Sequence, residues 1–169
     1  MSTFYTFLND KSNLATMKED IANAMANNAT AILSKIQTQV STPSNPSGTT
    51  STSPVQMGLG VTYTPSLTGR LLILIFGEVS NNTAGDGATV QLSYGAGVAP
   101  SNGASATGTA IGSKISITSN AASQTVPFAL GYILTGLTIG TNYWFDLQVA
   151  AVTGGTASVS NLTVLIIEF

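Results

Sequence analysis

Apolar residues recur every three or four positions over the first part of the chain. The series runs through Leu14, Met17, Ile21, Met25, Ile32, Ile36 and Val40, with Asn28 in its one gap. This spacing has the period of an α-helix and not of a strand. Thr16 with Glu19 matches a capping box, although Ser12 is an equally good N-cap. The pattern predicts a helix of about 25 residues with an apolar stripe along one side.

The predicted stripe needs a partner, because a solitary helix of this length is marginal in water. The sequence holds no second long helical pattern, so the stripe packs either on the β part of its own chain or against copies of itself. Asn28 favours copies, since one buried polar residue can set the register and strand number of a bundle. We therefore expect a self-associating helix whose contacts come from Leu14, Met17, Ile21, Met25, Asn28, Ile32 and Ile36.

Four large apolar residues come before the predicted helix: Phe4, Tyr5, Phe7 and Leu8. They either cap the helical bundle or anchor the chain in another protein. The same region lacks the basic start and apolar core of a secretory leader, so we do not expect export by that route.

Residues 41–54, STPSNPSGTTSTSP, contain only Ser, Thr, Pro, Asn and Gly. Three prolines oppose helix, and none of these side chains fills a core. We expect an extended linker that spans up to roughly 40 Å. The chain is thereby divided into an anchor and oligomerising helix (1–40), a linker (41–54) and a head (55–169).

Residues 55–169 alternate between short apolar runs and clusters of turn residues. The predicted strands cover 55–64, 70–80, 89–94, 114–118, 124–134, 142–152 and 156–169. The last one changes phase near Ser160 and Asn161, as a β-bulge would. With no helical period between the strands, the pattern predicts a mainly β fold, an antiparallel β-sandwich or jelly roll.

The run Leu71–Phe76 predicts a central strand that is buried on both faces. The head also contains more large aliphatic residues than one small core needs. We expect part of this surplus to line a contact between copies, and its candidates are Leu71, Ile73, Ile75, Val164 and Ile166.

Composition removes several kinds of chemistry. The chain has no His and no Cys, so Ser-His-Asp and Cys-His nucleophile systems cannot form and zinc, haem and iron–sulfur sites lack their usual ligands. Five basic residues and a net charge of −2 oppose nucleic-acid binding. The longest aliphatic run is far shorter than the roughly 20 residues of a membrane span. We expect no enzymatic activity, no cofactor, no metal and no membrane insertion.

Three weaker candidates remain. The acids Glu78, Asp86, Asp146 and Glu168 could supply a carboxylate pair. The loop 81–87 offers oxygen ligands for Ca²⁺, although a hairpin turn at Asp86-Gly87 is the simpler interpretation. Tyr143 and Trp144 are adjacent in a predicted strand, so one of them faces outward and could bind a sugar, as could the long loop 95–113.

The order of parts resembles that of short trimeric fibre and head-decoration (capsid spike) proteins of tailed bacteriophages. The segments NNTAGDGATVQLSYGAG and TNYWFDLQVAAVTGGTASVSNLTVLIIEF are similar to the β knobs of such proteins, and the head also resembles jelly-roll heads of the C1q and tumour-necrosis-factor type. The resemblance implies a homotrimer that is assembled in the host cytoplasm and displayed on the virion surface.

On this resemblance, the N-terminal residues hold the major capsid protein or another virion protein. The alternative is a receptor- or glycan-binding knob of a tail fibre or spike, with a host-surface glycan as its partner. No site residue carries over, because the resemblance rests on architecture.

Overall fold

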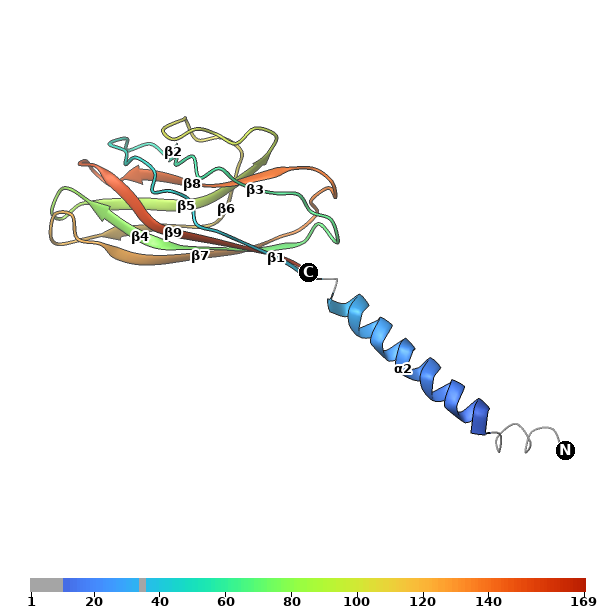
Figure 1. The fold of residues 1–169 in the computed structure, drawn as a ribbon. Coiled ribbons are helices and arrows are strands. Elements are labelled where there is room, and N and C mark those ends of the chain that lie inside the picture. Colours follow the sequence, from blue (N-terminus) through green and yellow to red (C-terminus); the bar gives the residue numbers. More distant parts are fainter. Residues whose placement is uncertain (1–10, 34–35) are drawn as a thin grey trace. The chain divides into compact units, whose positions relative to one another are not determined.

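The structure is a computed structural model that describes residues 11–33 and 36–169 (Figure 1). The chain divides into a helical unit, residues 1–36, and a β unit, residues 37–169. Helix α2 spans Lys11–Leu33. The β unit contains β1 (Gln37–Ser41), β2 (Val55–Gln56), β3 (Val61–Tyr63), β4 (Leu71–Asn81), β5 (Gly87–Ala96), β6 (Thr109–Thr118), β7 (Val126–Leu134), β8 (Tyr143–Ala151) and β9 (Ala157–Glu168). Within the described ranges, no helix is long and apolar enough to cross a membrane.

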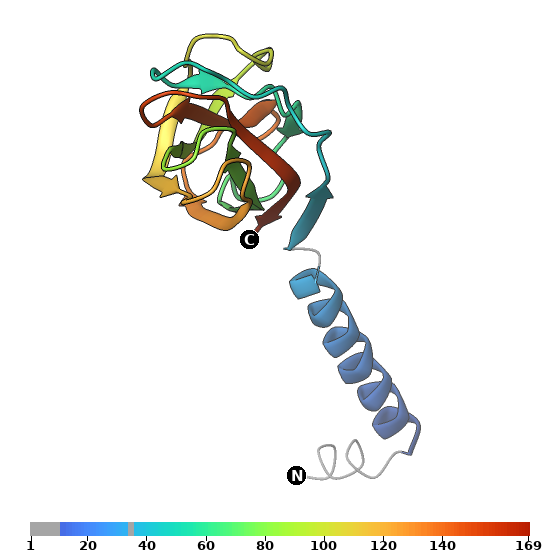
Figure 2. The same cartoon turned by 90° about the vertical axis from the view of Figure 1, so that its left-hand side faces the viewer.

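The strands form two antiparallel sheets, as predicted. One has the order β1-β9-β4-β7, and the other has the order β2-β8-β5-β6 with β3 also paired to β8. The strands pair from the two ends of the β unit inward, as β1·β9, β3·β8, β4·β7 and β5·β6, which is the pairing of one long hairpin. Rolling this hairpin up adds the pairs β4·β9 and β5·β8. With β2 and β3 counted as one interrupted strand, this is the eight-strand order of a jelly roll. Figure 2 shows the β unit viewed roughly along its strands.

The core lies between the two sheets. Leu71, Ile73 and Ile75 of β4 are fully buried there, together with Val164 and Ile166 of β9. Each of these residues contributes to the core of its own chain. The expectation that they line a contact between copies is therefore wrong, because two facing sheets use every inward position of their central strands.

The predicted bulge in the last strand is confirmed. Phe76 pairs with Thr163 and Glu78 pairs with Ser160, so Gly77 faces two residues of β9. Asn161 has a φ of 52°, a left-handed conformation that asparagine tolerates better than most residues. The bulge keeps Val159 and Leu162 both on the core side, although they are three positions apart.

The helix is shorter than the sequence pattern predicts. It ends at Leu33, and Gln37–Ser41 form β1 along the edge of β9, from Gln37 opposite Glu168 to Ser41 opposite Val164. Ile36 and Val40 are four positions apart, a spacing that fits a strand as well as a helix because it is an even number. The pairing with β9 decides between them, so the boundary falls after residue 36 and not after residue 40.

The segment 42–54 is not a free linker. Thr49 exchanges two backbone hydrogen bonds with Ala157, of 2.8 and 2.9 Å, and the N–H of Ala151 donates to the carbonyl of Ser51 at 2.8 Å. Farther back, the side chain of Asn45 accepts a hydrogen bond from the N–H of Asn161. The segment runs along the β unit and carries the chain from one sheet to the other, a role that needs backbone polar groups and not core side chains.

Candidate functional site

The acid nearest the end of the printed sequence organises a loop. Glu168 is fully buried, and its carboxylate accepts hydrogen bonds from the four successive backbone N–H groups of residues 66–69, at 2.8–3.0 Å. The phenol of Tyr63 donates to the same carboxylate at 3.2 Å. Burial by itself raises the pKa of Glu168, but these N–H donors outweigh it and lower the pKa to about 2. Burial, together with the charge of Glu168, raises the pKa of Tyr63 to about 12.

Asp146 and Asp86 have the same kind of role. Asp146 is buried on β8, where it accepts N–H groups of Gly58 and Leu59 at 2.9 and 3.2 Å, and burial raises its pKa despite these bonds. Asp86 accepts hydrogen bonds from the N–H groups of Gly87 and Thr153 at 2.7 and 3.0 Å. Burial by itself raises the pKa of Asp86, but these hydrogen bonds outweigh it and lower the pKa. These carboxylates hold loops in place, and none of them is paired with another acid.

The loop 81–87 does not form the expected hairpin turn. β4 and β5 belong to different sheets, so the loop crosses between layers. The side-chain oxygen of Asn81 accepts the N–H of Thr83 at 2.9 Å, and its amide donates to the carbonyls of Gly87 and Gly154. The side-chain oxygens of Asn81 and Asp86, which were candidate Ca²⁺ ligands, thus already accept hydrogen bonds from donors of the protein itself. Across the part of the chain that the structure describes, no three His, Cys, Asp or Glu side chains gather as a metal site.

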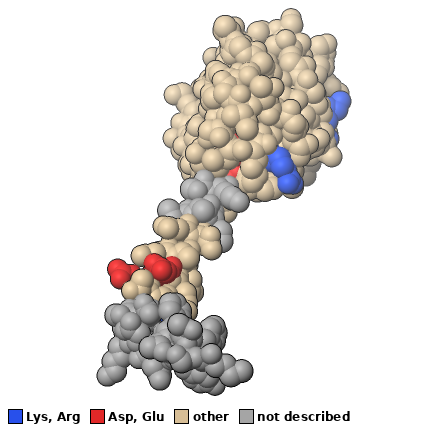
Figure 3. Space-filling model, turned by 90° about the vertical axis from the view of Figure 1, so that its right-hand side faces the viewer, with Lys and Arg blue, Asp and Glu red and all other residues tan. Residues whose placement is uncertain are grey.

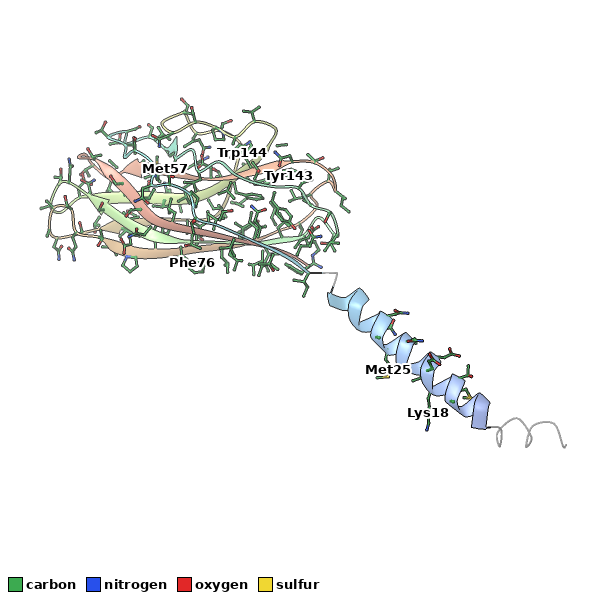
Figure 4. All side chains as sticks on the ribbon, in the orientation of Figure 1. Lys18, Met25, Met57, Phe76, Tyr143 and Trp144 are labelled. Atoms are coloured by element: carbon green, nitrogen blue, oxygen red, sulfur yellow. The ribbon has the colours of Figure 1, made fainter. Side chains whose placement is uncertain are left out.

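The two adjacent aromatic residues of β8 lie on opposite sides of their sheet. Trp144 is only 3% exposed, beneath the loop 97–108, and its ring lies so close to Gly95 and Gly108 that a Cβ at either glycine would clash with it. Tyr143 is half-buried on the other side, and its hydroxyl accepts the N–H of Thr138 at 3.1 Å. Figure 4 shows both side chains. The expected outward-facing aromatic platform for a sugar is therefore wrong, because the loop covers it.

The apolar stripe of α2 is exposed within the helical unit. Met17, Ile21 and Met25 are 48, 57 and 68% exposed, and Asn28 is exposed as well. Figure 4 labels Met25 on this helix. Leu14 and Ile32 belong to α2, but their side chains lie outside the described part, and Ile36 follows the helix instead of continuing it.

The four proposed anchor residues, Phe4, Tyr5, Phe7 and Leu8, lie outside the described residues.

A second apolar surface covers the side of the β1-β9-β4-β7 sheet that faces away from the core. Directly paired residues share a face of a sheet, and two cross-strand rows on this side are apolar: Val40, Leu165 and Leu74, and then Ile167, Leu72 and Ile133. Phe76 extends the surface along β4, and Figure 4 shows it on the outer side of the sheet. We name these residues the outer apolar face: Val40, Leu72, Leu74, Phe76, Ile133, Leu165 and Ile167.

The most exposed members of the outer apolar face are Val40 (63%), Ile133 (54%) and Phe76 (43%). The outward side of an antiparallel sheet usually carries polar residues. This face was not predicted, because the aliphatic run of β4 fits a strand that is buried on both sides. The signal that could have found it is the second series of apolar residues, at the positions between the core residues.

Charge is nearly absent from this surface. Along β4, within residues 37–169, the charged residues nearest to the face are Arg70 before its first row and Glu78 beyond its last. Arg70 lies over the ring of Phe169, 5.1 Å from its centre, and Glu78 accepts a hydrogen bond from Asn161 at 2.8 Å. In the view of Figure 3, too, few charged atoms interrupt the surface of the β unit.

A polar hollow of about 230 Å³ lies between the edges of β1 and β3. It is lined mainly by Gln39, Ser41, Leu59 and Thr62, and the side chain of Gln39 bridges it by donating to the carbonyl of Thr62 at 3.0 Å. No charged or aromatic side chain lines this hollow, so it has little with which to hold a ligand.

Comparison with known proteins gives a fold and no family. No protein-family model matches the chain, and no curated protein matches it in sequence. Solved structures do resemble it. The T13 viral particle of infectious bursal disease virus matches with a TM-score of 0.51 at 10% identity, over 79% of this chain and 31% of the viral chain. The T=1 particles derived from the same virus match with a TM-score of 0.50 at 9% identity, over 79% and 32%.

The dimeric latent PorU of Porphyromonas gingivalis also matches, with a TM-score of 0.45 at 12% identity, over 79% of this chain and 13% of PorU. The chain thus spans about a third of the viral chains that it matches. At such low identity, the likeness to the two viral particles shows the fold alone: a two-sheet β fold of the kind found in viral capsid proteins.

Proposed function

We propose that this protein is a virion structural protein, a homotrimer that attaches to the capsid of a tailed bacteriophage as a head fibre or decoration protein. In this proposal, the stripe of α2 joins the copies and the residues Phe4, Tyr5, Phe7 and Leu8 bind the capsid. The β unit is the projecting head. The protein is then displayed on the virion surface and needs no chemistry of its own.

One observation carries this proposal: a helix with an exposed apolar stripe precedes a jelly roll whose buried acids all hold loops. A stripe of this kind is stable in water only when a partner covers it. Asn28 on the stripe fits a bundle of fixed strand number. The capsid-like fold of the head supports a structural role, and the burial of Trp144 leaves the alternative, a glycan-binding knob, without its aromatic site.

Sedimentation equilibrium tests the self-association. The full chain should have three times its 17.2 kDa monomer mass. Replacing a stripe residue, Ile21→Lys, should yield monomers because it places a charge in the bundle core. The matched control is Asn23→Lys, two positions farther along and on roughly the opposite side of the helix. A wild-type chain that sediments as a monomer would contradict the proposal.

A separate experiment tests the capsid anchor. Deletion of residues 1–12 should leave the trimer intact but abolish its co-sedimentation with purified phage capsids. If the truncated protein still binds capsids, the anchor lies elsewhere. Binding of the full protein to a glycan array would instead favour the receptor-binding alternative.

A further inference from the structure

We infer that the outer apolar face is a second self-association surface, on which each copy packs against the same face of its sister copies in a parallel assembly. This inference rests on the proposed self-association through α2 and adds the heads to it. The residues expected from the sequence to line such a contact, among them Ile73 and Ile75, are in the core. Their neighbours Leu72, Leu74 and Phe76 point to the other side of the same strand.

The pattern of burial calls for a partner at this surface. Two strands of the sheet interior, β4 and β9, carry aliphatic residues on both faces, although only one face lies on the core. The edge strands β1 and β7 continue the apolar rows with Val40 and Ile133. Thr38 on β1 and Gly131 on β7 end one row each, so each row covers three of the four strands. An apolar surface with members on all four strands is typical of an interaction site and not of a solvated sheet face.

The lack of charge identifies the kind of partner. A nucleic acid or an anionic membrane surface is held by clustered cations, and residues 37–169 hold only two: Arg70, at one end of the face, and Lys114, on β6 of the other sheet. The charged groups of a charged protein partner would find no opposite charge across the two apolar rows. An uncharged, apolar surface is complementary to another of the same kind, and a sister copy carries an identical surface.

The size of the face explains why it would act together with the helix. Three members that are 43–63% exposed and four that are half-buried present on the order of 500 Å². A stable interface buries roughly 800 Å² on each partner, so this face alone would bind weakly. Helix α2 ends only a few residues before β1, so association of the helices would raise the effective concentration of the heads to about the millimolar range.

Cysteine cross-linking tests this inference, because the natural chain contains no Cys. Phe76→Cys places a thiol on the face, and Val98→Cys places one on the loop 97–108, where Val98 is 94% exposed. Full-length single-Cys proteins would be treated with a short bis-maleimide and separated by denaturing electrophoresis. We expect Phe76→Cys to link chains on the order of tenfold more efficiently than Val98→Cys. Equal efficiencies would overturn the inference.

Further variants make the result unambiguous. Ile133→Cys, on the neighbouring strand, repeats the test if Phe76→Cys does not fold. Adding Ile21→Lys should abolish the cross-link, since the heads then lose their tether. Cross-linking that occurs only in a mixture of Leu72→Cys and Phe76→Cys would indicate an antiparallel pair of faces and would also overturn the inference. A trimer without a Phe76→Cys cross-link leaves the proposed function standing and refutes the head contact, whereas a monomer refutes both.

Discussion

The phenol of Tyr63 donates a hydrogen bond to the carboxylate of Glu168 at 3.2 Å. Tyr63 lies at the end of β3 in one sheet, and Glu168 lies at the end of β9 in the other. The same carboxylate accepts the backbone N–H groups of residues 66–69, in the loop that leads from β3 to β4. One buried side chain thus fixes the place where the chain passes from one sheet to the other.

Removing the charge of this carboxylate should destabilise the fold. In Glu168→Gln, the NH₂ of the new amide group donates hydrogen bonds and cannot accept them. Some of the backbone N–H donors that face it would therefore be left unpaired. We expect the free energy of unfolding to fall by about 3 kcal/mol, the usual scale for buried hydrogen bonds to a charged group. Urea unfolding followed by circular dichroism measures it. The control Glu78→Gln, at a partly exposed acid with one hydrogen bond, should change stability by less than about 0.5 kcal/mol.

The same group should make the protein less stable in acid. The pKa of Glu168 is about 2 in the folded chain and has an ordinary value of 4.5. Its contribution is therefore complete above pH 4.5 and is lost as the pH falls through that value toward 2. Asp86, whose pKa is also lowered, acts in the same direction, whereas Asp146, whose pKa is raised, acts in the opposite one.

Urea midpoints measured between pH 6 and pH 2 check this pH dependence. The decline should be clearly smaller in Glu168→Gln than in the natural chain. Parallel declines in the two proteins would show that Glu168 is not the group responsible.

The covering of Trp144 by the loop 97–108 can be tested with a matched pair of glycines. Gly103 and Gly108 both have a positive φ, of 80° and 71°, so alanine is strained at either position. A Cβ at Gly103 meets open space, whereas one at Gly108 would clash with the Trp144 ring. We expect Gly108→Ala to expose the ring and shift its emission to the red, and Gly103→Ala to leave the emission unchanged. Trp144 is the only tryptophan in the sequence, so fluorescence reports on it directly.

The polar position in the helix stripe gives a prediction about assembly. Asn28→Ile should raise the thermal midpoint of the full protein, because an apolar residue packs better in a bundle core. It should also broaden the distribution of masses in sedimentation, because the residue that sets the strand number is gone. Asn27→Ile, which lies off the stripe, is the control. Indistinguishable effects of the two substitutions would argue against Asn28 as a bundle residue.

Local patterns in the sequence were enough to predict most of the separate elements, although not β1. The period-two runs marked strands close to β4, β7, β8 and β9, and the change of phase at Ser160 and Asn161 marked the bulge. These features depend on near neighbours along the chain, which a sequence displays directly. The trimer and the anchor remain predictions.

Only the tertiary structure decided the points that depend on contacts between distant residues. The spacing of Ile36 and Val40 fits a helix and a strand alike, and pairing with β9 placed Val40 in β1, which begins at Gln37. Tyr143 and Trp144 alternate as expected, but a loop some 40 positions earlier in the sequence decided that Trp144 is covered. The alternating runs of β4 show two apolar faces, and the position of the second sheet determined which of them became the core and which the outer apolar face. The physical reason is common to all three: periodicity gives each strand its two sides, but the side that water reaches is set by what packs against it from elsewhere in the chain.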